Sequence, residues 1–549
     1  MTPRARRALF SVFIFFVVCA VAGSVLQREV GAQSAVGESQ VRDSLKSFLD
    51  VYAIVEQNYA EPIDSEKAST IIYDGAIPGM LRVLDPHSNF YDPKAYAKMR
   101  EEQHGRYYGV GMLIQQQNGK VYVVAPYENT PSFNAGIHPG DIIYAVDGKI
   151  VNVDGKNPDN PNELTSSDAV AKALKGPKGT HVQATMLREG MAKPMVFDLE
   201  RASIPHPSVD LAFEIRPGVG YIHLTQFQET TAEEMSEAID GFGNLKGLVL
   251  DLRNNPGGLL DQAVDVSDHL LSKGQAIVSQ RGRPNSENSD KYYSATHGNG
   301  GKTFPIVVVV NRGTASAAEI VSGALQDHDR ALIVGETTFG KGLVQTVYNL
   351  SENTGLALTT YHYYTPSGRL IQRNYTGVSL FDYYSHGGTA PSDTASREVK
   401  LTDAGRTVYG GGGITPDEKI ESPKNNRFQE TLLYKDAFFH FAPVFLANRT
   451  VDKNFKVDDE VIAEFKKYLT KQNIAWTDAD LNGVMDWVKI NIKEKIFTIQ
   501  FGQLQGLRAK ADSDPEIQKA LGFLPEAQAL EDHAHKVLAE KAEARGETR

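Results

Sequence analysis

A short run of β-branched residues from Pro305 to Val310 constrains the fold more than any other stretch of the sequence. A strand facing water on one side would alternate apolar and polar residues, so this unbroken run predicts a strand buried on both faces. A turn and a helix follow over about 315–326, and the next apolar strand spans 331–334. Strand–helix–strand units build sheets covered by helices, so the sequence predicts an α/β core over residues 202–424.

Residues 1–33 predict an export signal. Arginines at the N-terminus precede an apolar run from Ala8 to Leu26, which is the arrangement of a signal peptide or of a short membrane anchor. Val30 and Ala32 fit a small-residue cleavage pattern, and both alternatives stay open on the sequence. Either way we expect the remaining chain outside the cytoplasm, in the periplasm, released or anchored to the inner membrane, with membrane contact only through residues 8–26.

Changes in periodicity divide the rest of the chain. Residues 34–104 predict helices, because apolar residues recur at three- and four-residue spacing. Residues 105–201 predict short strands separated by glycine turns. Residues 425–549 predict a second helical region, whose apolar stripe runs from Val457 to Leu469 and would occupy one helix face.

Composition limits the chemistry that this chain can use. Its one cysteine is Cys19, so no disulfide can form within the chain. No cluster of residues has metal-ligand spacing, and we expect no metal and no cofactor. The net charge is −11, whereas a nucleic-acid binder usually has a basic excess, so we expect no nucleic-acid partner.

The segment Asn311–Ile320 places Ser316 after the buried strand and a glycine turn, at the start of the predicted helix. Free N–H groups at such a position stabilise a developing oxyanion, which suits a nucleophile. The same serine, with Glu319 three residues later, also fits a capping box. On the local sequence alone, the capping role is the simpler interpretation.

The segment Gly335–Gln345 nearly matches a phosphate-binding loop, but Gly342 stands where that motif needs a hydroxyl for magnesium. A lysine among glycines after a buried strand fits another role. Desolvation lowers the pKa of the amine, and a neutral Lys341 can then accept a serine proton. Gln345 could orient the lysine by hydrogen bonding. A solvated loop lysine and a nucleotide-binding protein remain the alternatives.

A third segment, Asp251–Gly258, runs from a strand into a Pro-Gly-Gly turn. Glycines there allow the backbone to turn sharply and to bring N–H groups close to a ligand. Alone, such a segment is usually only a turn.

Together and in this order, the segments Leu250–Gly258, Ala315–Glu319 and Thr338–Gln345 resemble the carboxyl-terminal processing proteases, and the spacing of Ser316 and Lys341 fits that family. The resemblance covers roughly residues 41–424. Further matching segments are Leu84–Ser88, Gln326–Arg330 and Gly412–Asp417.

The resemblance implies a serine endopeptidase with a crotonase-like α/β core, an inserted PDZ domain and helical N- and C-terminal regions. It implies acyl transfer from a peptide bond to Ser316, with Lys341 as the general base and Gln345 orienting the lysine. It places the oxyanion hole at the backbone N–H groups of Gly257 or Gly258 and of Ala317.

Residues 105–201 resemble a PDZ domain, which binds a peptide as an added strand. The resemblance places the loop for the peptide's C-terminal carboxylate at Gly109, Val110, Gly111 and Met112. Expected partners are proteins or peptides with exposed C-termini, and an adaptor or a second copy bound through the C-terminal helices. The alternative from another functional class is a PDZ scaffold with an inactive protease-like core.

Overall fold

The computed structural model describes residues 40–153, 160, 162–188, 190–283, 290–385, 397–447 and 449–544. The chain divides into two compact units, of which the second begins at Asp85. The predicted export signal, including the apolar run of residues 8–26, lies outside the described residues. Within the described ranges, no helix combines the length and the apolar character needed to span a membrane.

The first unit is helical where it is described, as the sequence predicts. Residues 40–58 form one helix. Asp64 caps the next helix, because its carboxylate accepts from the Lys67 N–H at 2.8 Å. The helices that follow are α2 (Ser65–Thr70), a π-helical turn η1 (Ile71–Ala76) and α3 (Ile77–Arg82).

The second unit is built on a six-stranded sheet that confirms the predicted α/β core. Its first strand is antiparallel to its neighbour, and the other pairs are parallel. Every residue of the strand predicted from the β-branched run is buried. In spatial order the strands are β11 (Val209–Arg216), β12 (Val219–Leu224), β13 (Gly247–Asp251), β16 (Ile306–Val310), β17 (Leu332–Gly335) and β22 (Glu418–Lys419).

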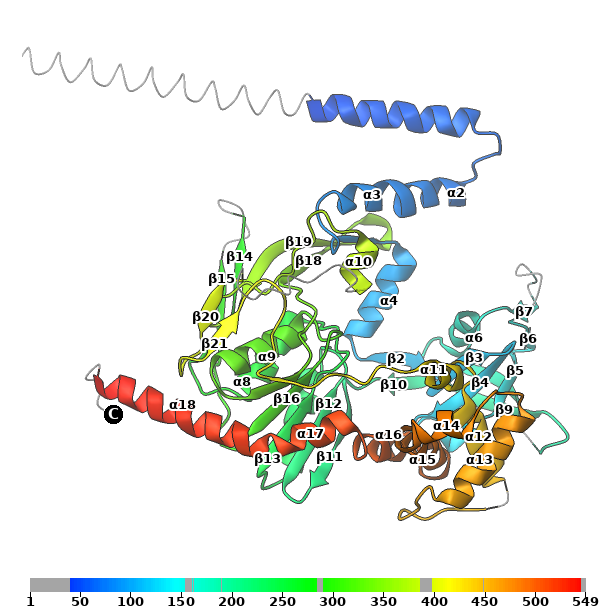
Figure 1. The fold of residues 1–549 in the computed structure, drawn as a ribbon. Coiled ribbons are helices and arrows are strands. Elements are labelled where there is room, and N and C mark those ends of the chain that lie inside the picture. The colour runs from blue at the N-terminus through cyan, green and yellow to red at the C-terminus, as the bar shows by residue number, and fades with distance from the viewer. Residues whose placement is uncertain are drawn as a thin grey trace, which may run out of the picture. The chain divides into compact units, whose positions relative to one another are not determined.

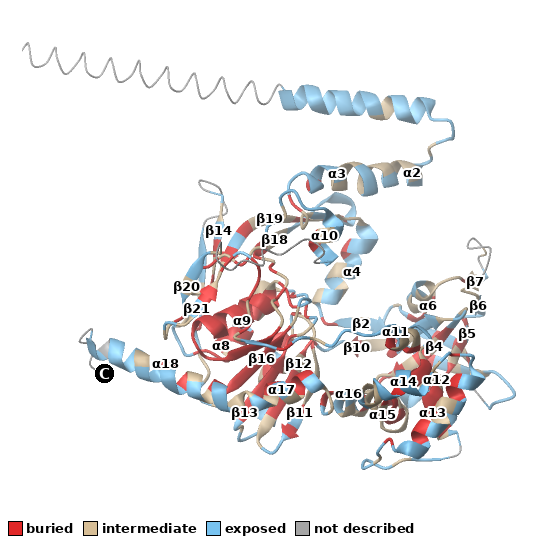
Figure 2. Ribbon diagram, in the orientation of Figure 1, coloured by how far each residue is buried: buried red, intermediate tan, exposed pale blue. Residues whose placement is uncertain are grey.

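Helices cover both faces of this sheet (Figures 1 and 2). Leu248 and Leu250 of β13 pack with the helices of one face, whereas Val249 between them packs with Ile517 and Ala520 on the other face. Strand residues point alternately to opposite faces, so a strand between two helical layers must be apolar throughout. The helices of the first face are α7 (Thr231–Gly241), α8 (Leu260–Asp268) and α9 (Ala317–Asp327), and those of the second are α17 (Pro515–Gly522) and α18 (Leu524–Ala544).

A second, antiparallel sheet belongs to the same unit. It combines strands that precede Lys341 in the sequence with strands that follow it. Its strands are β1 (Asn89–Tyr91), β14 (Ala276–Gly282), β15 (Lys291–Ser294), β18 (Leu343–Asn349) and β19 (Gly355–Tyr364). Shorter elements around it are α4 (Pro93–Gln103), η2 (Ser351–Asn353), α10 (Leu380–Ser385), β20 (Val399–Leu401) and β21 (Thr407–Tyr409).

The domain predicted to be a PDZ domain enters and leaves the core through one pair of strands. Gly109 of β2 (Arg106–Gly109) is opposite Ala202 of β10 (Ala202–Pro205), so the two ends of the insertion lie side by side. Within the domain the elements are β3 (Met112–Gln117), β4 (Lys120–Pro126), α5 (Pro131–Asn134), β5 (Ile142–Val146), β6 (Lys149–Val151), β7 (Glu163–Leu164), α6 (Ser167–Leu174), β8 (His181–Leu187) and β9 (Met195–Glu200).

The C-terminal helices form a hydrophobic core of their own. Phe465, in the middle of the predicted apolar stripe, stacks on Phe438, and Val461 and Leu469 are buried beside it. The stripe therefore stabilises this region itself, and binding of an adaptor or a second copy through the C-terminal helices stays a prediction. These helices are α11 (Arg427–Tyr434), α12 (Ala437–Leu446), α13 (Asp459–Lys471), α14 (Asp478–Asn482) and α15 (Met485–Phe501), followed by α16 (Gln503–Ala511).

Candidate active site

The turn between β16 and α9 holds Ser316 in a strained conformation, with φ +54° and ψ −116°. A non-glycine residue in this region costs about 1 kcal/mol or more and persists only where neighbours hold it. Ala315 N–H donates to the Asn255 carbonyl at 2.9 Å, and Tyr363 Oη donates to the Ser316 carbonyl at 3.1 Å. The strain is thus maintained by contacts on both sides of the serine.

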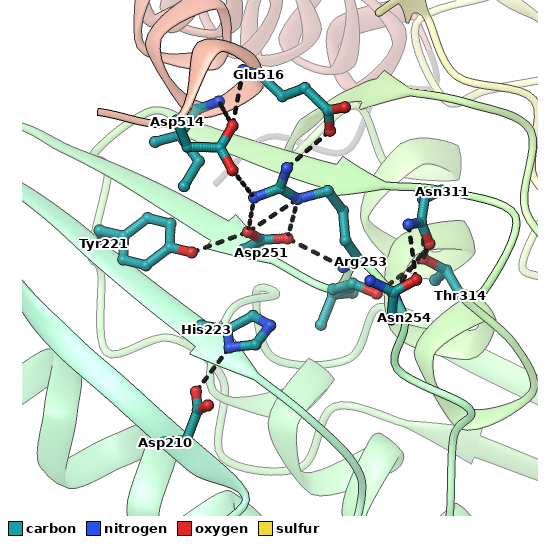
Figure 3. Close-up of polar contacts among 12 residues, drawn as sticks. Asp210, Tyr221, His223, Asp251, Arg253, Asn254, Asn311, Thr314, Asp514 and Glu516 are labelled. Atoms are coloured by element: carbon teal, nitrogen blue, oxygen red, sulfur yellow. Dashed lines mark hydrogen bonds and ion pairs between the residues drawn. The ribbon is translucent and has the colours of Figure 1, made fainter. Parts of the chain in front are cut away.

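Thr314 ties this turn to the neighbouring strand. Its buried hydroxyl donates to the Leu252 carbonyl at 2.8 Å and accepts from the Asn311 N–H at 3.0 Å. Asn311 in turn makes paired hydrogen bonds with Asn254 (Figure 3). Hydrogen bonds therefore join the serine turn to the Pro-Gly-Gly turn.

Glu319, which the sequence suggests only as a capping partner, joins the serine turn to the lysine segment. Its buried carboxylate accepts from Ser316 N–H at 2.8 Å, as the capping box requires. It also accepts from Gly340 N–H at 2.7 Å, Lys341 N–H at 2.9 Å and the Thr338 hydroxyl. Burial raises the pKa of Glu319, and these hydrogen bonds lower it in part. The carboxylate fixes Ser316 and Lys341 relative to each other.

The segment from Phe339 to Lys341 carries an aromatic ring and a buried amine. The Phe339 and Tyr383 rings meet edge-on at 5.5 Å, and the Arg373 guanidinium lies 4.5 and 4.7 Å from their centroids. Burial lowers the pKa of Lys341, against the carboxylates of Glu319 and Asp85, which raise it. A neutral amine is the form that can accept a proton.

The segment Asp85–Ser88 closes the site beside the lysine, a role that the sequence did not reveal. Asp85 Oδ1 accepts from the N–H groups of His87 and Ser88 at 2.7 Å, and His87 Nε2 lies 2.8 Å from Tyr383 Oη. Burial, followed by the charge of Lys341, lowers the pKa of His87 to about 4. His87 is therefore neutral near pH 7.

The Pro-Gly-Gly turn lies directly against the serine turn. A methyl group added at Gly257, whose φ is +95°, would lie 2.7 Å from Ser316 Cβ and 2.8 Å from Ala317 N. Gly257 N–H donates to Asn255 Oδ1 at 2.9 Å. Within the described part of the chain, the N–H groups of Gly258 and Ala317 have no protein acceptor, so they are the ones available to an oxyanion.

One cavity of about 430 Å³ is lined by all six residues that the resemblance assigns to the catalytic site and the oxyanion hole. Gln345 reaches it from β18, where its amide donates to Thr359 Oγ1 at 3.3 Å. His87 and Tyr363 also line this cavity. The predicted residues that it brings together are Ser316, Lys341, Gln345, Gly257, Gly258 and Ala317.

The PDZ loop from Gly109 to Met112 lies outside this cavity, at the start of β3. Ser132 fixes the loop, because its N–H and hydroxyl both donate to the Val110 carbonyl, at 2.9 and 2.7 Å. The described residues contain no group of three or more histidine, cysteine or carboxylate side chains arranged to hold a metal ion.

Replacing Gly257 with alanine is expected to reduce kcat about a hundredfold, the usual effect of losing one oxyanion donor, because the methyl group would crowd Ser316 and the Ala317 N–H. Steady-state cleavage of a denatured protein measures this. Gly274→Ala is the matched control, since φ there is +90° and nothing lies within 4 Å of the added methyl group. Equal losses in the two variants would show that backbone strain, rather than the site, is responsible.

Comparison with known proteins adds to this geometry. Residues 218–379 match the family described as Peptidase family S41, and residues 109–195 match the PDZ domain. The carboxy-terminal-processing protease of Bartonella bacilliformis is 40% identical over 366 residues, covering 65% of this chain and 80% of the relative. The carboxy-terminal processing protease CtpA of Bacillus subtilis is 32% identical over 413 residues, covering 73% and 83%. Among solved structures, a photosystem II D1 C-terminal processing protease is 27% identical and covers 68% of this chain and 92% of its own, with a TM-score of 0.32.

Proposed function

The chain belongs to the carboxy-terminal processing proteases of peptidase family S41, and we propose that it cleaves peptide bonds with Ser316 as nucleophile and Lys341 as general base. The observation that carries this proposal is the buried Glu319 carboxylate, which accepts hydrogen bonds from the backbone N–H groups of Ser316 and Lys341. Both residues line the same cavity. The lowered pKa of Lys341 supports the role of its amine as a base.

In the proposed first step, neutral Lys341 Nζ takes the proton of Ser316 Oγ as the oxygen attacks the substrate's carbonyl carbon. The negative charge moves to the carbonyl oxygen, where the N–H groups of Gly258 and Ala317 donate to it. The C–N bond then breaks, and the lysine ammonium gives its proton to the leaving amine. An ester between Ser316 and the acyl part of the substrate remains.

In the second step, Lys341 is neutral again and takes a proton from a water molecule that attacks the ester. The same N–H groups stabilise the second oxyanion, and Ser316 recovers its proton when the ester breaks. Gln345, held in β18 by its bond to Thr359, is proposed to orient the lysine amine from the side of the cavity.

Substrates are proposed to be exported proteins with exposed C-termini. β3 is an edge strand of the PDZ sheet, which is where a peptide adds as a further strand. The loop at Gly109–Met112 is proposed to receive the peptide's C-terminal carboxylate. The basic and apolar N-terminal sequence supports a periplasmic site of action.

A fluorophosphonate probe tests the proposed nucleophile, because it reacts with serines that have both a base and an oxyanion hole. We expect labelling at Ser316 alone, located by mass spectrometry of the digested protein. Denatured protein, which keeps the same serines without the site, is the control. A folded protein that takes up no label would instead favour the PDZ scaffold with an inactive core.

A further inference from the structure

Arg253 connects the sheet to the C-terminal segment, defined here as α16 to α18 (Gln503–Ala544). Its guanidinium binds Asp251 of β13 at 2.7 Å, Glu516 at 2.7 Å and Asp514 at 3.1 Å (Figure 3). The side chain of Arg253 is only 16% exposed. Charged hydrogen bonds in such a protected place are stronger than those at the surface.

The side-chain carboxylates of Asp514 and Glu516 lie at the start of α17. Asp514 Oδ1 caps this helix by accepting from the N–H groups of Glu516 and Ile517, at 2.8 and 3.2 Å, which leaves Oδ2 for Arg253. Beyond them, Ile517 and Ala520 are buried on the core sheet. The carboxylates are therefore held by a packed helix.

Arg253 immediately precedes the oxyanion loop, defined as residues 254–258. Asn255 is fully buried in this loop, where its amide donates to the Leu224 carbonyl at 2.8 Å and accepts from Gly257 N–H at 2.9 Å. Its own carbonyl accepts from Ala315 N–H, next to the serine. A shift of Arg253 would thus reach both sides of the proposed oxyanion hole.

Tyr221 completes the contacts of Asp251, to which its hydroxyl donates at 2.8 Å. A polar cavity of about 450 Å³ lies on the same side of the sheet and is lined by Arg253, Asp514 and Glu516. Without the carboxylates of Asp514 and Glu516, the Arg253 guanidinium would have room to turn into this cavity. Asp251 alone would then hold it.

We propose that Asp514 and Glu516 are positioning residues for the reaction: the C-terminal segment holds Arg253, and Arg253 holds the oxyanion loop in its productive geometry. The catalytic consequence rests on the proposed function, whereas the effect on the loop does not. The segment is thereby assigned a role in the protease core, which its sequence does not indicate.

The test compares the full-length protein with the double variant Asp514→Asn/Glu516→Gln. Both changes keep shape and remove charge, and asparagine still caps a helix. Loss of charged hydrogen bonds is expected to make the backbone amides of the oxyanion loop exchange hydrogen about tenfold faster, and to lower kcat about tenfold with KM changed less than about twofold. Hydrogen-exchange mass spectrometry and steady-state kinetics measure these effects.

Asp512→Asn is the matched control. Asp512 binds Arg216 at 2.7 Å and joins the same segment to the edge strand β11, away from the oxyanion loop. It should leave exchange in the loop and kcat unchanged. Equal effects in the control and the double variant, or unchanged exchange in the double variant, would overturn the proposal.

Two further outcomes are distinguishable. If the double variant does not fold, Glu516→Gln alone, which leaves the Asp514 cap intact, is measured with the same expected direction and the same control. If the parent protein has no turnover, the proposed function fails, and hydrogen exchange in the loop still decides whether the C-terminal segment positions it.

Discussion

Replacing Ser316 with alanine is expected to lower kcat/KM for an unfolded protein such as casein about a millionfold, which is the size of effect seen when a serine nucleophile is removed from a cooperating site. Only the Oγ atom is lost, and the turn remains held by the Ser316 main chain through Glu319 and Tyr363. The substrate then has no atom with which to form the acyl-enzyme. Release of labelled peptides over time measures the loss.

A neighbouring serine provides the control for this variant. Ser322 lies in the same helix, buried, and its hydroxyl donates to the Ala318 carbonyl at 2.8 Å. Ser322→Ala should retain most of the activity, because that hydroxyl serves only its own helix. Turnover by Ser316→Ala at more than about a thousandth of the parental rate would mean that another group is the nucleophile.

Replacing Lys341 with methionine is expected to lower kcat about a thousandfold, within the range attributed to a general base. Methionine fills similar space but cannot accept a proton. Lys341→Arg is the decisive partner variant. Arginine keeps the positive charge and stays protonated at all accessible pH values, so it should be as inactive as methionine. An active arginine variant would show that the charge, and not the free amine, is what the reaction requires.

The pH dependence of the parent enzyme follows from the same residue. The active form of Lys341 is neutral, so kcat/KM should rise with pH as the lysine loses its proton. Burial lowers the pKa of Lys341 from its ordinary 10.5, so this rise should be centred below pH 10.5. A profile of kcat/KM from pH 5 to 10, with protein stability followed at each pH, shows whether the rise is present.

Local patterns in the sequence were enough for the main parts of the core, whereas the residues of the cavity were predicted from the resemblance of three segments to a known family. The β-branched run predicted β16, and its unbroken apolar character follows from helices on both faces of the sheet. Gly257, Ser316 and Lys341 stand in short segments whose residue types are restricted by backbone shape or by chemistry. Their order along the chain matched the family, and that resemblance predicted that they lie together.

Other contributions to the site could not be predicted because they depend on contacts between distant segments. In the sequence, Glu319 looks only like the partner of Ser316 in an ordinary capping box. Its hydrogen bonds with Thr338 and Lys341 are seen only in the structure. His87 acquires its low pKa from burial and then from the charge of Lys341, and both depend on the tertiary structure. The sequence pattern around residues 85 and 319 does not indicate the distant residues that Glu319 and His87 contact.

The C-terminal region illustrates the division between sequence and structure most clearly. Its periodicity determined that it is helical and has apolar faces, because that spacing depends only on 3.6 residues per helical turn. Which surface each face covers was decided by the tertiary structure: the stripe around Phe465 is buried within the region, whereas Ile517 lies on the core sheet. An apolar face gains stability from any apolar surface that excludes water, since the hydrophobic effect has no direction. The sequence by itself therefore determined the helices and predicted the residues that line the cavity, and only the tertiary structure brought Asp514 and Glu516 to Arg253.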